Sequence, residues 1–371
     1  MSASPQVIGI VGSAGAYGRW LQRFFRECMH LRVIGHDPAD PASHTPEQLL
    51  DQADVLLFSA PIRHTPALIA DYVQRAAGRE AGKLWLDITS VKEAPVQAML
   101  ASHAEVAGLH PMTAPPKAPT LKGRVMVVCA ARVDRWQPWL QELCVALQAE
   151  CVRATPAHHD KVMALVQAMV HAGHLAQAGV LRDYAAELGD LSALLPYRSA
   201  SFELDTAIIS RILSLNPAIY EDIQFGNPHV ALMLERLIAQ LQQLQSQVLK
   251  GDDAARAAFR QQLLHSNRDA FGPDVLADGN YTFERVGYLL ADLTERQSLS
   301  VHLPEDRPGS LRALLHVFEQ HQISLASIHS SRTPRGEVHF RIGFVPDSSD
   351  MAIAAAAAEV DDSGIGRVLP R

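Results

Sequence analysis

A histidine at position 110 is the residue whose type and position point most directly to chemistry. His110 ends the short apolar segment GLHPM and lies about one nucleotide-binding unit beyond a glycine-rich turn. Removal of a hydride from a carbinol carbon leaves a hydroxyl proton, and a neutral imidazole accepts a proton near pH 7. The position therefore predicts a dehydrogenase in which His110 faces a nicotinamide ring. A histidine with a purely structural role is the other interpretation.

A serine lies where it can assist that histidine. Ser90 follows the apolar run LWLDIT and is expected to project from a neighbouring strand end toward the same crevice. Its hydroxyl can orient an imidazole or a substrate oxygen. It can equally cap the helix that follows the segment 89–95. Both interpretations of Ser90 stay open on the residues alone.

An arginine in the segment 202–215 shares a helix face with apolar residues. Arg211 lies at helical spacing from Leu204, Ile208 and Leu215. Burial of an unpaired charge costs several kcal/mol, so this arginine is expected to have an anionic partner. The partner is either an acidic side chain of the fold or a substrate carboxylate held by two parallel hydrogen bonds.

A polar stripe follows the helical segment 160–183. Gln167, His171, His174 and Gln177 recur at steps of four and three residues among alanine, valine and leucine. Such a stripe faces either solvent or a polar site. No acidic or cysteine residue has the spacing that would complete a metal site with the two histidines, so no metal is predicted.

The glycine-rich segment GSAGAYG directly follows an apolar strand and precedes a helical pattern. Backbone N–H groups at such a helix start can receive a pyrophosphate. Gly15 would let phosphates approach, and Gly18 would let the helix pack closely on the strand. A strict GxGxxG motif has glycine where this chain has Ser13. The residues predicted to contact a dinucleotide are Gly12, Ser13, Gly15, Ala16, Tyr17 and Gly18.

An acidic residue ends the second predicted strand. Asp37 lies 19 residues beyond Gly18, where a carboxylate accepts hydrogen bonds from the adenosine ribose. Because this carboxylate repels a 2′-phosphate, the sequence predicts NAD rather than NADP. A simple turn residue before a proline is the alternative. Ser59, Pro61 and Ile62 leave the third strand and are predicted to contact the cofactor.

The elements that must position these residues fall into three segments. Strands alternate with helices in residues 1–152, which predicts a doubly wound Rossmann sheet that is mostly parallel. Residues 153–297 show only helical spacing. Residues 298–371 have the order βαββαβ of a ferredoxin-like unit. The predicted fold class is therefore α/β with an all-helical middle domain. The strands expected in the first segment are 7–11, 31–37, 54–61, 83–89, 105–110 and 124–130.

One helix of the middle segment carries a heptad seam. Asn216 and Asn227, each followed by proline, are predicted helix starts. The apolar seam packs against another helix, either within the subunit or across a dimer, and we favour a homodimer. Its residues are Val230, Leu234, Leu237, Leu241, Leu244 and Val248.

Composition narrows the class of protein. The chain of 371 residues has 48% hydrophobic residues and a formal net charge of -7, so nucleic acid and anionic membranes are not expected partners. No charged start precedes a long apolar run, and we expect a cytoplasmic protein without a membrane span. No CxxC pair occurs, so buried free thiols are predicted for Cys28, Cys129, Cys144 and Cys151.

Five segments together resemble the prephenate dehydrogenase (cyclohexadienyl dehydrogenase) family of tyrosine biosynthesis. They are the glycine turn, DITSVK, GLHPM, the run from His158 to His171 and the helix that carries Arg211. The resemblance covers about residues 7–290, and GLHPM and QAMVH are its most specific parts. It implies a Rossmann domain, a helical dimerisation domain, NAD as cofactor, and oxidative decarboxylation of prephenate to 4-hydroxyphenylpyruvate.

The resemblance also implies roles for four residues. His110 matches the catalytic histidine that interacts with the substrate 4-hydroxyl, and Ser90 matches the serine that supports it. His171 matches a second active-site histidine, and Arg211 matches the arginine that binds the ring carboxylate.

Three positions depart from the family pattern. Thr113 and Ala114 stand where many relatives have an aromatic residue and glycine, and Glu203 stands where some have arginine. These departures leave open an arogenate or dual-specificity cyclohexadienyl dehydrogenase. A redox-inactive sensor of NAD and amino acids is an alternative from another class, and the presence of the catalytic histidine, serine and arginine argues against it.

The last segment looks like an ACT domain, a module that binds amino acids. DRPGSL lies between its first strand and helix, and Gly309, Ser310 and Leu311 are the expected effector contacts. Feedback by L-tyrosine is the natural hypothesis for this pathway. An ACT unit that is only structural or dimerising is the alternative.

Overall fold

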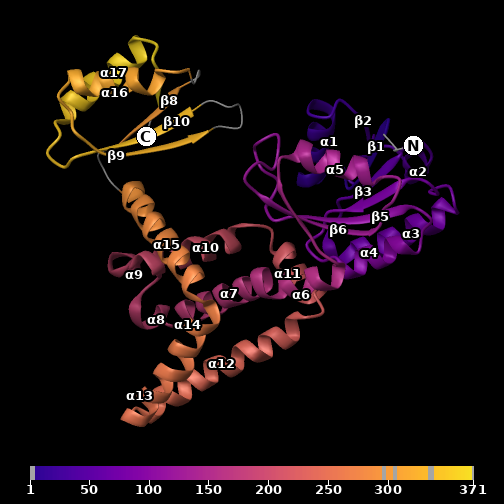
Figure 1. Cartoon of the computed structure of the whole chain (residues 1–371), viewed down its shortest axis with the longest axis horizontal. Helices are drawn as coiled ribbons and strands as arrows, with labels where there is room; N and C mark the ends of the chain where they lie inside the picture. Colours follow the sequence, from indigo (N-terminus) through magenta and orange to yellow (C-terminus); the bar gives the residue numbers. More distant parts are fainter. Residues whose placement is uncertain (1–4, 295–297, 304–306, 333–337, 370–371) are drawn as a thin grey trace. The chain divides into compact units, whose positions relative to one another are not determined.

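The computed structural model describes residues 5–294, 298–303, 307–332 and 338–369 (Figure 1). The chain divides into two compact units, Met1–Gln243 and Leu244–Arg371, with the boundary inside one long helix. The first unit holds a seven-stranded sheet and the helices that follow it, up to that boundary. The second unit holds further helices and a four-stranded sheet.

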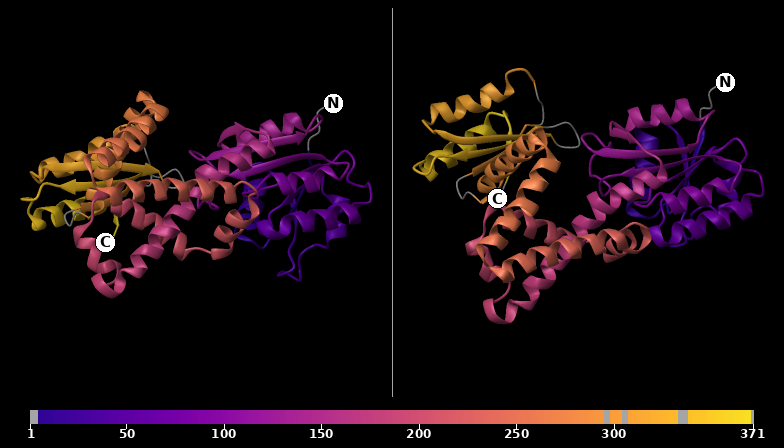
Figure 2. Two further views of the ribbon diagram at one scale, coloured as in Figure 1. Left: turned by 90° about the horizontal axis from the view of Figure 1, so that it is seen from below. Right: turned by 60° about the horizontal axis from the view of Figure 1, so that its bottom comes forward.

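The sheet of the first unit has the strand order β2-β1-β3-β4-β5-β6-β7. Figure 2 shows this part of the chain, in indigo to magenta, from two further sides. Neighbours from β2 to β5 are parallel, β6 is antiparallel to β5, and β7 is parallel to β6. The order reverses at β1, and a crevice for ligands opens at such a reversal, outside the carboxyl ends of the strands. The doubly wound fold predicted from the sequence is confirmed. The strands are β1 (Val7–Val11), β2 (Arg32–His36), β3 (Val55–Phe58), β4 (Leu84–Asp87), β5 (Glu105–Pro111), β6 (Val125–Arg132) and β7 (Glu150–Arg153).

Helices cover both faces of this sheet, and its central strands are therefore buried on both sides. One face packs on α1 and α5 through Phe24 and Leu140. The other face packs on α2, α3 and α4 through Leu49, Tyr72 and Met99. The helical elements around the sheet are α1 (Ala16–Glu27), α2 (Pro46–Gln52), η1 (Ile62–His64), α3 (Thr65–Ala76), α4 (Glu93–Leu100) and α5 (Gln137–Leu147).

The segment after β7 is helical, as predicted. Asn216 caps α11 as expected, since its Oδ1 accepts from the Ala218 N–H at 3.1 Å. Asn227 instead caps the end of α11, and α12 begins at Val230 after a turn in which Asn227 Oδ1 accepts from the His229 N–H at 2.9 Å. A π-helical turn, η2, interrupts these helices. The elements are α6 (Pro156–Met163), η2 (Ala164–Met169), α7 (Val170–Asp183), α8 (Ala185–Leu188), α9 (Leu191–Leu194), η3 (Leu195–Tyr197), α10 (Ala200–Ser214), α11 (Pro217–Gly226) and α12 (Val230–Lys250).

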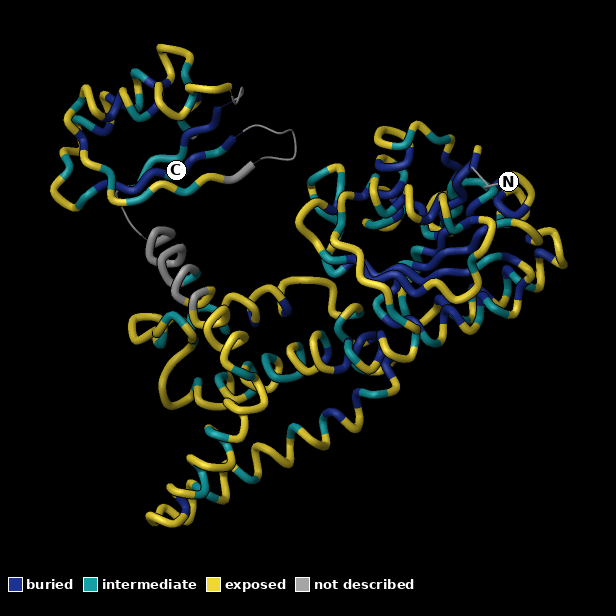
Figure 3. Tube along the Cα trace, viewed as in Figure 1, coloured by how far each residue is buried: buried dark blue, intermediate teal, exposed yellow. Residues whose placement is uncertain are grey.

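The heptad seam on α12 is buried only at its start. Val230 is 3% exposed, whereas Leu241, Leu244 and Val248 are 56, 40 and 65% exposed (Figure 3). Leu234 and Leu237 are partly buried, so it is the second half of the predicted seam that is exposed in this single chain.

The second unit ends in the predicted βαββαβ fold. Its sheet has the order β11-β8-β10-β9 with antiparallel neighbours, and α16 and α17 pack on one face through Leu314, Phe318 and Val360. Asp306, the first residue of the DRPGSL segment, lies outside the described residues. The elements are α13 (Asp253–Phe259), η4 (Arg260–His265), α14 (Ser266–Phe271), α15 (Pro273–Thr294), β8 (Ser298–Leu303), α16 (Ser310–Gln320), β9 (Leu325–Arg332), β10 (Val338–Phe344), α17 (Asp350–Asp362) and β11 (Arg367–Leu369).

Two sequence expectations are wrong. Strand β7 was not predicted, because its four residues lie exposed at the sheet edge and form no apolar run. The four cysteines are free as predicted, but Cys28 and Cys151 are exposed rather than buried. None of the described helices is long and apolar enough to cross a membrane.

Candidate active site

The glycine turn has the tight packing that its sequence predicts. Gly12 has a φ of 84° and lies against the carbonyl of Ser59, which follows β3. A Cβ atom on Gly18 would collide with the Gly12 carbonyl oxygen and would lie 2.8 Å from Cα of Ser13. The backbone of β1, the start of α1 and the end of β3 therefore pack so closely at the turn that no side chain fits at Gly12 or Gly18. Helix α1 begins here with no side-chain cap, which leaves its first N–H groups available to an anion.

Asp37 lies beside this turn, at the end of β2. Its two carboxylate oxygens accept from the N–H groups of Ala14 and Ala39, each at 2.9 Å. Each oxygen keeps a further lone pair for a ribose hydroxyl. The geometry of the turn and of Asp37 fits an adenosine dinucleotide.

The three residues predicted beyond β3 have different surroundings. Ser59 supports Gly12, and Pro61 is exposed. Ile62 packs against Ala168, Ile223 and other apolar residues of the helical segment. Ile62 thus also joins the sheet layer to the helices, a second role that the sequence did not indicate.

His110 is buried at the carboxyl end of β5 and is held by another histidine. His110 Nδ1 lies 2.8 Å from His159 Nε2, and His159 Nδ1 lies 2.7 Å from Asp160 Oδ1. His110 is 2% exposed, His159 1% and Asp160 0%. The two rings meet edge to face, with centroids 5.0 Å apart. We call these three residues the relay.

The carboxylate at the end of the relay is fixed by backbone groups from the start of α4. Asp160 accepts from the N–H of Lys92 at 2.7 Å and from the N–H of Glu93 at 2.9 Å. Asn227 Nδ2 donates to the Asp160 carbonyl at 2.7 Å. The relay therefore depends on the contact between α4, α6 and the start of α12.

Burial keeps His110 neutral. Loss of solvent on burial is the main cause that holds the pKa of His110 well below its ordinary value near 6.5, and the positive charge of Lys92 lowers it further. A neutral imidazole is the form that accepts a proton. His110 is therefore available as a base over the whole neutral range.

A buried ion pair lies directly behind His110. Lys92 Nζ pairs with Asp87 Oδ1 and donates to the Leu109 carbonyl at 3.0 Å, and neither side chain of the pair is exposed. Thr89 donates to the same carboxylate from its hydroxyl at 2.7 Å. Gly108 must be glycine, because a Cβ there would lie 2.8 Å from Lys92 Cδ. The pair fixes the backbone immediately before His110.

Ser90 lies after β4 and is partly buried. Within the described residues its hydroxyl has no hydrogen bond, and the Nδ1 atom of His110 is bonded to His159. A supporting role for Ser90 therefore stays a prediction that concerns Nε2 or the substrate.

His171 lies on α7, one residue beyond η2. Its ring meets Tyr220 edge to face at 4.9 Å, and partial burial, followed by repulsion from His174, lowers its pKa. Within the described residues, His171 Nδ1 and the nearby Gln167 Oε1 are buried without hydrogen-bond partners. Unpaired buried polar atoms are costly, which favours a polar site over solvent on this stripe. His174 has a partner within the fold, Asp205 Oδ1 at 3.3 Å.

Arg211 is exposed, so the sequence argument from a buried charge is wrong. On α10 the buried residues are Thr206, Ile209 and Ile212, whereas Ile208 is 37% exposed. The face chosen from spacing lies about one residue away from the buried one. Among the described residues, Arg211 has no carboxylate partner, so its guanidinium is available to an anion.

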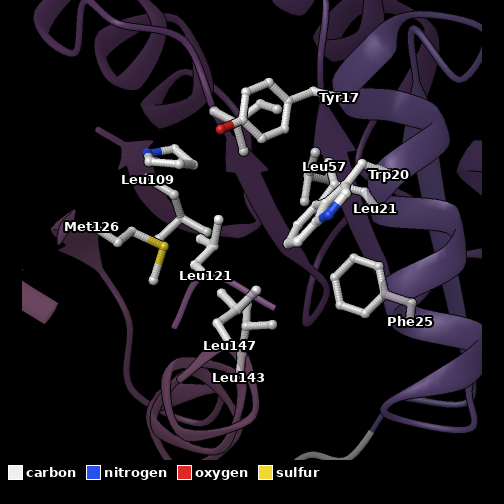
Figure 4. A pocket seen from close by; sticks show the side chains of 12 residues that line it. Tyr17, Trp20, Leu21, Phe25, Leu57, Leu109, Leu121, Met126, Leu143 and Leu147 are labelled. Atoms are coloured by element: carbon white, nitrogen blue, oxygen red, sulfur yellow. The ribbon is translucent and has the colours of Figure 1, made fainter. Parts of the chain in front are cut away.

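A small apolar pocket lies among α1, the sheet and α5 (Figure 4). Tyr17 and Trp20 of α1, Leu109 of β5 and Leu143 of α5 line it. Its lining is aliphatic and aromatic and offers little to orient a polar ligand. The hydroxyl of Tyr17 donates instead to the carbonyl of Thr113, and burial raises the pKa of Tyr17.

The predicted effector contacts lie at the start of α16. Gly309 has a φ of 101° and precedes this helix, and Leu311 is 41% exposed. Ser310 Oγ accepts from the Arg307 N–H at 3.1 Å. Gly309 and Leu311 border a shallow depression with Arg312.

Sequence reasoning missed four residues of the site: Asp87, Lys92, His159 and Asp160. Two signals were present. LWLD places an acidic residue at the end of an apolar strand, and the run HHDK joins a histidine to an acid just before the predicted polar stripe. A search of the described residues finds no cluster that would hold a metal ion.

Two family models match the chain. Residues 155–262 match "Prephenate dehydrogenase, dimerization domain", and residues 297–357 match "ACT domain". A "Probable arogenate/prephenate dehydrogenase" of Methanocaldococcus jannaschii is 25% identical over 310 residues, which cover 79% of this chain and 67% of that protein. The "T-protein" of Enterobacter agglomerans is 30% identical over 248 residues, or 66% of this chain. The chain spans only 63% of the length of that T-protein.

Among solved structures, the prephenate dehydrogenase of A. aeolicus in complex with hydroxyphenyl propionate and NAD+ is similar in fold. It has a TM-score of 0.57 and 18% identity, over 70% of this chain and 97% of that one.

The fold defines a Rossmann-like α/β protein with a helical middle region and a small C-terminal module. The resemblance to the prephenate dehydrogenase family is confirmed: residues 155–262 match the model of that family's dimerisation domain, and residues 297–357 match the model of an ACT domain.

Proposed function

We propose that the protein is an NAD-dependent oxidoreductase that converts prephenate to 4-hydroxyphenylpyruvate. The observation that carries the proposal is His110, a neutral, buried imidazole at the carboxyl end of a strand that lies in the same sheet as the glycine turn. A base at that position serves hydride removal from a carbinol. The similarity to dehydrogenases acting on prephenate or arogenate supports the substrate class.

The proposed reaction balances as follows. A bound NAD, which the glycine turn and Asp37 would hold, would supply the acceptor for the hydride that leaves the carbinol carbon. His110 Nε2 forms a bond to the hydroxyl proton as the carbonyl forms. The bond to the ring carboxylate breaks, its electron pair enters the ring, and CO2 leaves. The former carbonyl oxygen becomes a phenolate oxygen and takes the proton back from His110 Nε2, which gives the phenol of the product. Because the ring becomes aromatic, the reaction is effectively irreversible.

Arg211 is proposed to bind the substrate carboxylate. Arg211→Ala is expected to raise KM about 10- to 100-fold with a smaller change in kcat, since a charge-assisted hydrogen bond contributes about 1.5–3 kcal/mol. Steady-state kinetics measure both constants. Arg182→Ala is the control, because Arg182 is exposed and pairs only with its neighbour Asp183. An unchanged KM in Arg211→Ala would remove this role.

One absorbance assay tests the substrate and cofactor together. NADH or NADPH formation is followed with prephenate or arogenate as substrate. Turnover with prephenate and NAD is expected, and Asp37→Ser is expected to reduce the preference for NAD over NADP, because the carboxylate that repels a 2′-phosphate is lost. A dual-specificity or arogenate enzyme would show itself by equal or faster arogenate turnover. Absence of turnover with both substrates would instead favour the sensor.

The ACT domain is proposed to make the enzyme sensitive to L-tyrosine, with Gly309, Ser310 and Leu311 at the effector site. The same assay with added tyrosine measures inhibition in the full chain. Inhibition that survives deletion of residues 298–371 would place the tyrosine site elsewhere.

The protein is proposed to be a homodimer that buries the exposed seam of α12. Leu241→Asp combined with Leu244→Asp is expected to yield monomers, because burying two unpaired carboxylates in a helix interface is costly. Sedimentation velocity measures the mass, and Gln242→Asp is the matched control on the same exposed helix. A double variant that stays dimeric would exclude the seam as the interface.

A further inference from the structure

We infer that His159 and Asp160 are positioning residues that fix the tautomer of His110, so that its lone pair lies on Nε2. The inference rests on the proposed function for its kinetic consequence. Its geometric basis is the relay, in which each nitrogen of His159 and one nitrogen of His110 has a defined partner.

The assignment starts at the carboxylate. Asp160 accepts two backbone N–H bonds, and a carboxylate offers only acceptors to its third partner. His159 Nδ1 must therefore carry the proton in that contact. A neutral His159 then has its lone pair on Nε2, so His110 Nδ1 must donate to it. The lone pair of His110 is left on Nε2.

The alternative arrangement has the opposite outcome. If His159 were doubly protonated, its Nε2–H would donate to His110 Nδ1, and a neutral His110 would then carry its proton on Nε2. His110 would be unable to accept a proton there. One extra proton in the relay thus abolishes the base. The charged groups around the relay are Lys92 and Asp87 from the end of β4 and the start of α4, and Asp160 from α6.

The relay also gives the accepted proton a path. When Nε2 binds the substrate proton, the Nδ1 proton can shift to His159 Nε2, and the positive charge then lies against Asp160. This path runs only through His110, His159 and Asp160, so it needs no contact with solvent, from which all three side chains are buried. The catalytic group remains His110, and the other two act through it.

The matched variants are His159→Phe and His159→Gln. Phenylalanine keeps the ring volume and removes the acceptor, whereas the glutamine Oε1 can still accept from His110 Nδ1. His159→Phe is expected to lower kcat about 10²- to 10⁴-fold with little change in KM, the range for loss of a correctly positioned base. His159→Gln is expected to recover at least about tenfold of that loss. His158→Phe, at an exposed neighbour on α6, is the control.

The direct readout is nitrogen NMR of histidine side chains in the full chain. His110 signals are identified by their loss in His110→Asn. The wild type is expected to show His110 protonated on Nδ1 only, and His159→Phe is expected to shift it toward the Nε2–H form. A wild-type His110 protonated on Nε2, or a His159→Phe variant with wild-type kcat, would overturn the inference. If the wild type turns over neither substrate, the proposed function fails, while the tautomer measurement still decides the inference.

Discussion

Replacing His110 with asparagine is expected to lower kcat by about 10²- to 10⁴-fold, which is the usual contribution of a general base. KM is expected to change little, because His110 acts on a proton that moves only in the transition state. Asparagine is close to the size of the imidazole and is polar, so the fold should tolerate it. Steady-state kinetics with prephenate and NAD measure both constants. His158→Asn, at the exposed histidine of α6, controls for substitution itself.

The pH dependence of kcat/KM in the wild type is a second test of His110 as the general base. Lowering the pH protonates His110 and removes the base, so kcat/KM falls on the acid side. Since burial holds the pKa of His110 well below 6.5, this fall is expected below pH 6.5 and not near neutrality. The acid limb should disappear in His110→Asn. A variant that kept both the wild-type kcat and the acid limb would exclude His110 as the base.

Replacing Lys92 with methionine is expected to destabilise the first unit by about 3–5 kcal/mol, the usual cost of removing one partner of a buried ion pair. The Asp87 carboxylate would keep its bonds to Thr89 but lose its counter-charge, and its Oδ2 atom already has no hydrogen bond among the described residues. Urea unfolding followed by fluorescence of the buried tryptophans measures the change. Any folded fraction should also turn over more slowly, since Lys92 holds the Leu109 carbonyl next to His110.

A second substitution separates charge from packing. Adding Asp87→Asn to Lys92→Met removes the unpaired carboxylate, and the double variant is expected to be more stable than Lys92→Met alone. Lys161→Met, at an exposed lysine on α6, should change stability by less than about 0.5 kcal/mol. If Lys92→Met were as stable as this control, the ion pair would not be needed for the fold.

The sequence predicts those parts of the molecule that local patterns determine. Apolar runs of four to eight residues gave the central strands, and glycine spacing gave the turn at Gly12, because both depend on neighbours in the chain. The βαββαβ order of the last segment follows from the same reasoning. Strand β7 was missed since an exposed edge strand needs no apolar run.

The relay was missed for a different reason. His110 and Asp160 are 50 residues apart, and no periodicity connects the end of a strand with the start of a distant helix. The face of α10 was wrong because three-residue and four-residue steps fit two adjacent faces, and only packing against α7 selects the one with Ile209. The position of His110 at the end of an apolar segment predicted its role, but its contact with His159 is visible only in the folded chain.

The π-helical turn η2 separates two groups of side chains on one continuous stretch of helix. His159 lies before this turn and His171 after it. A π turn holds one more residue than an α turn, and one residue corresponds to about 100° of rotation. A single deletion within Ala164–Met169 would therefore turn His171 and everything after it to a new direction while His159 stayed in place. The residues on α7 that we propose to face the substrate could thus diverge by a change in length, while His110, His159 and Asp160 kept their arrangement.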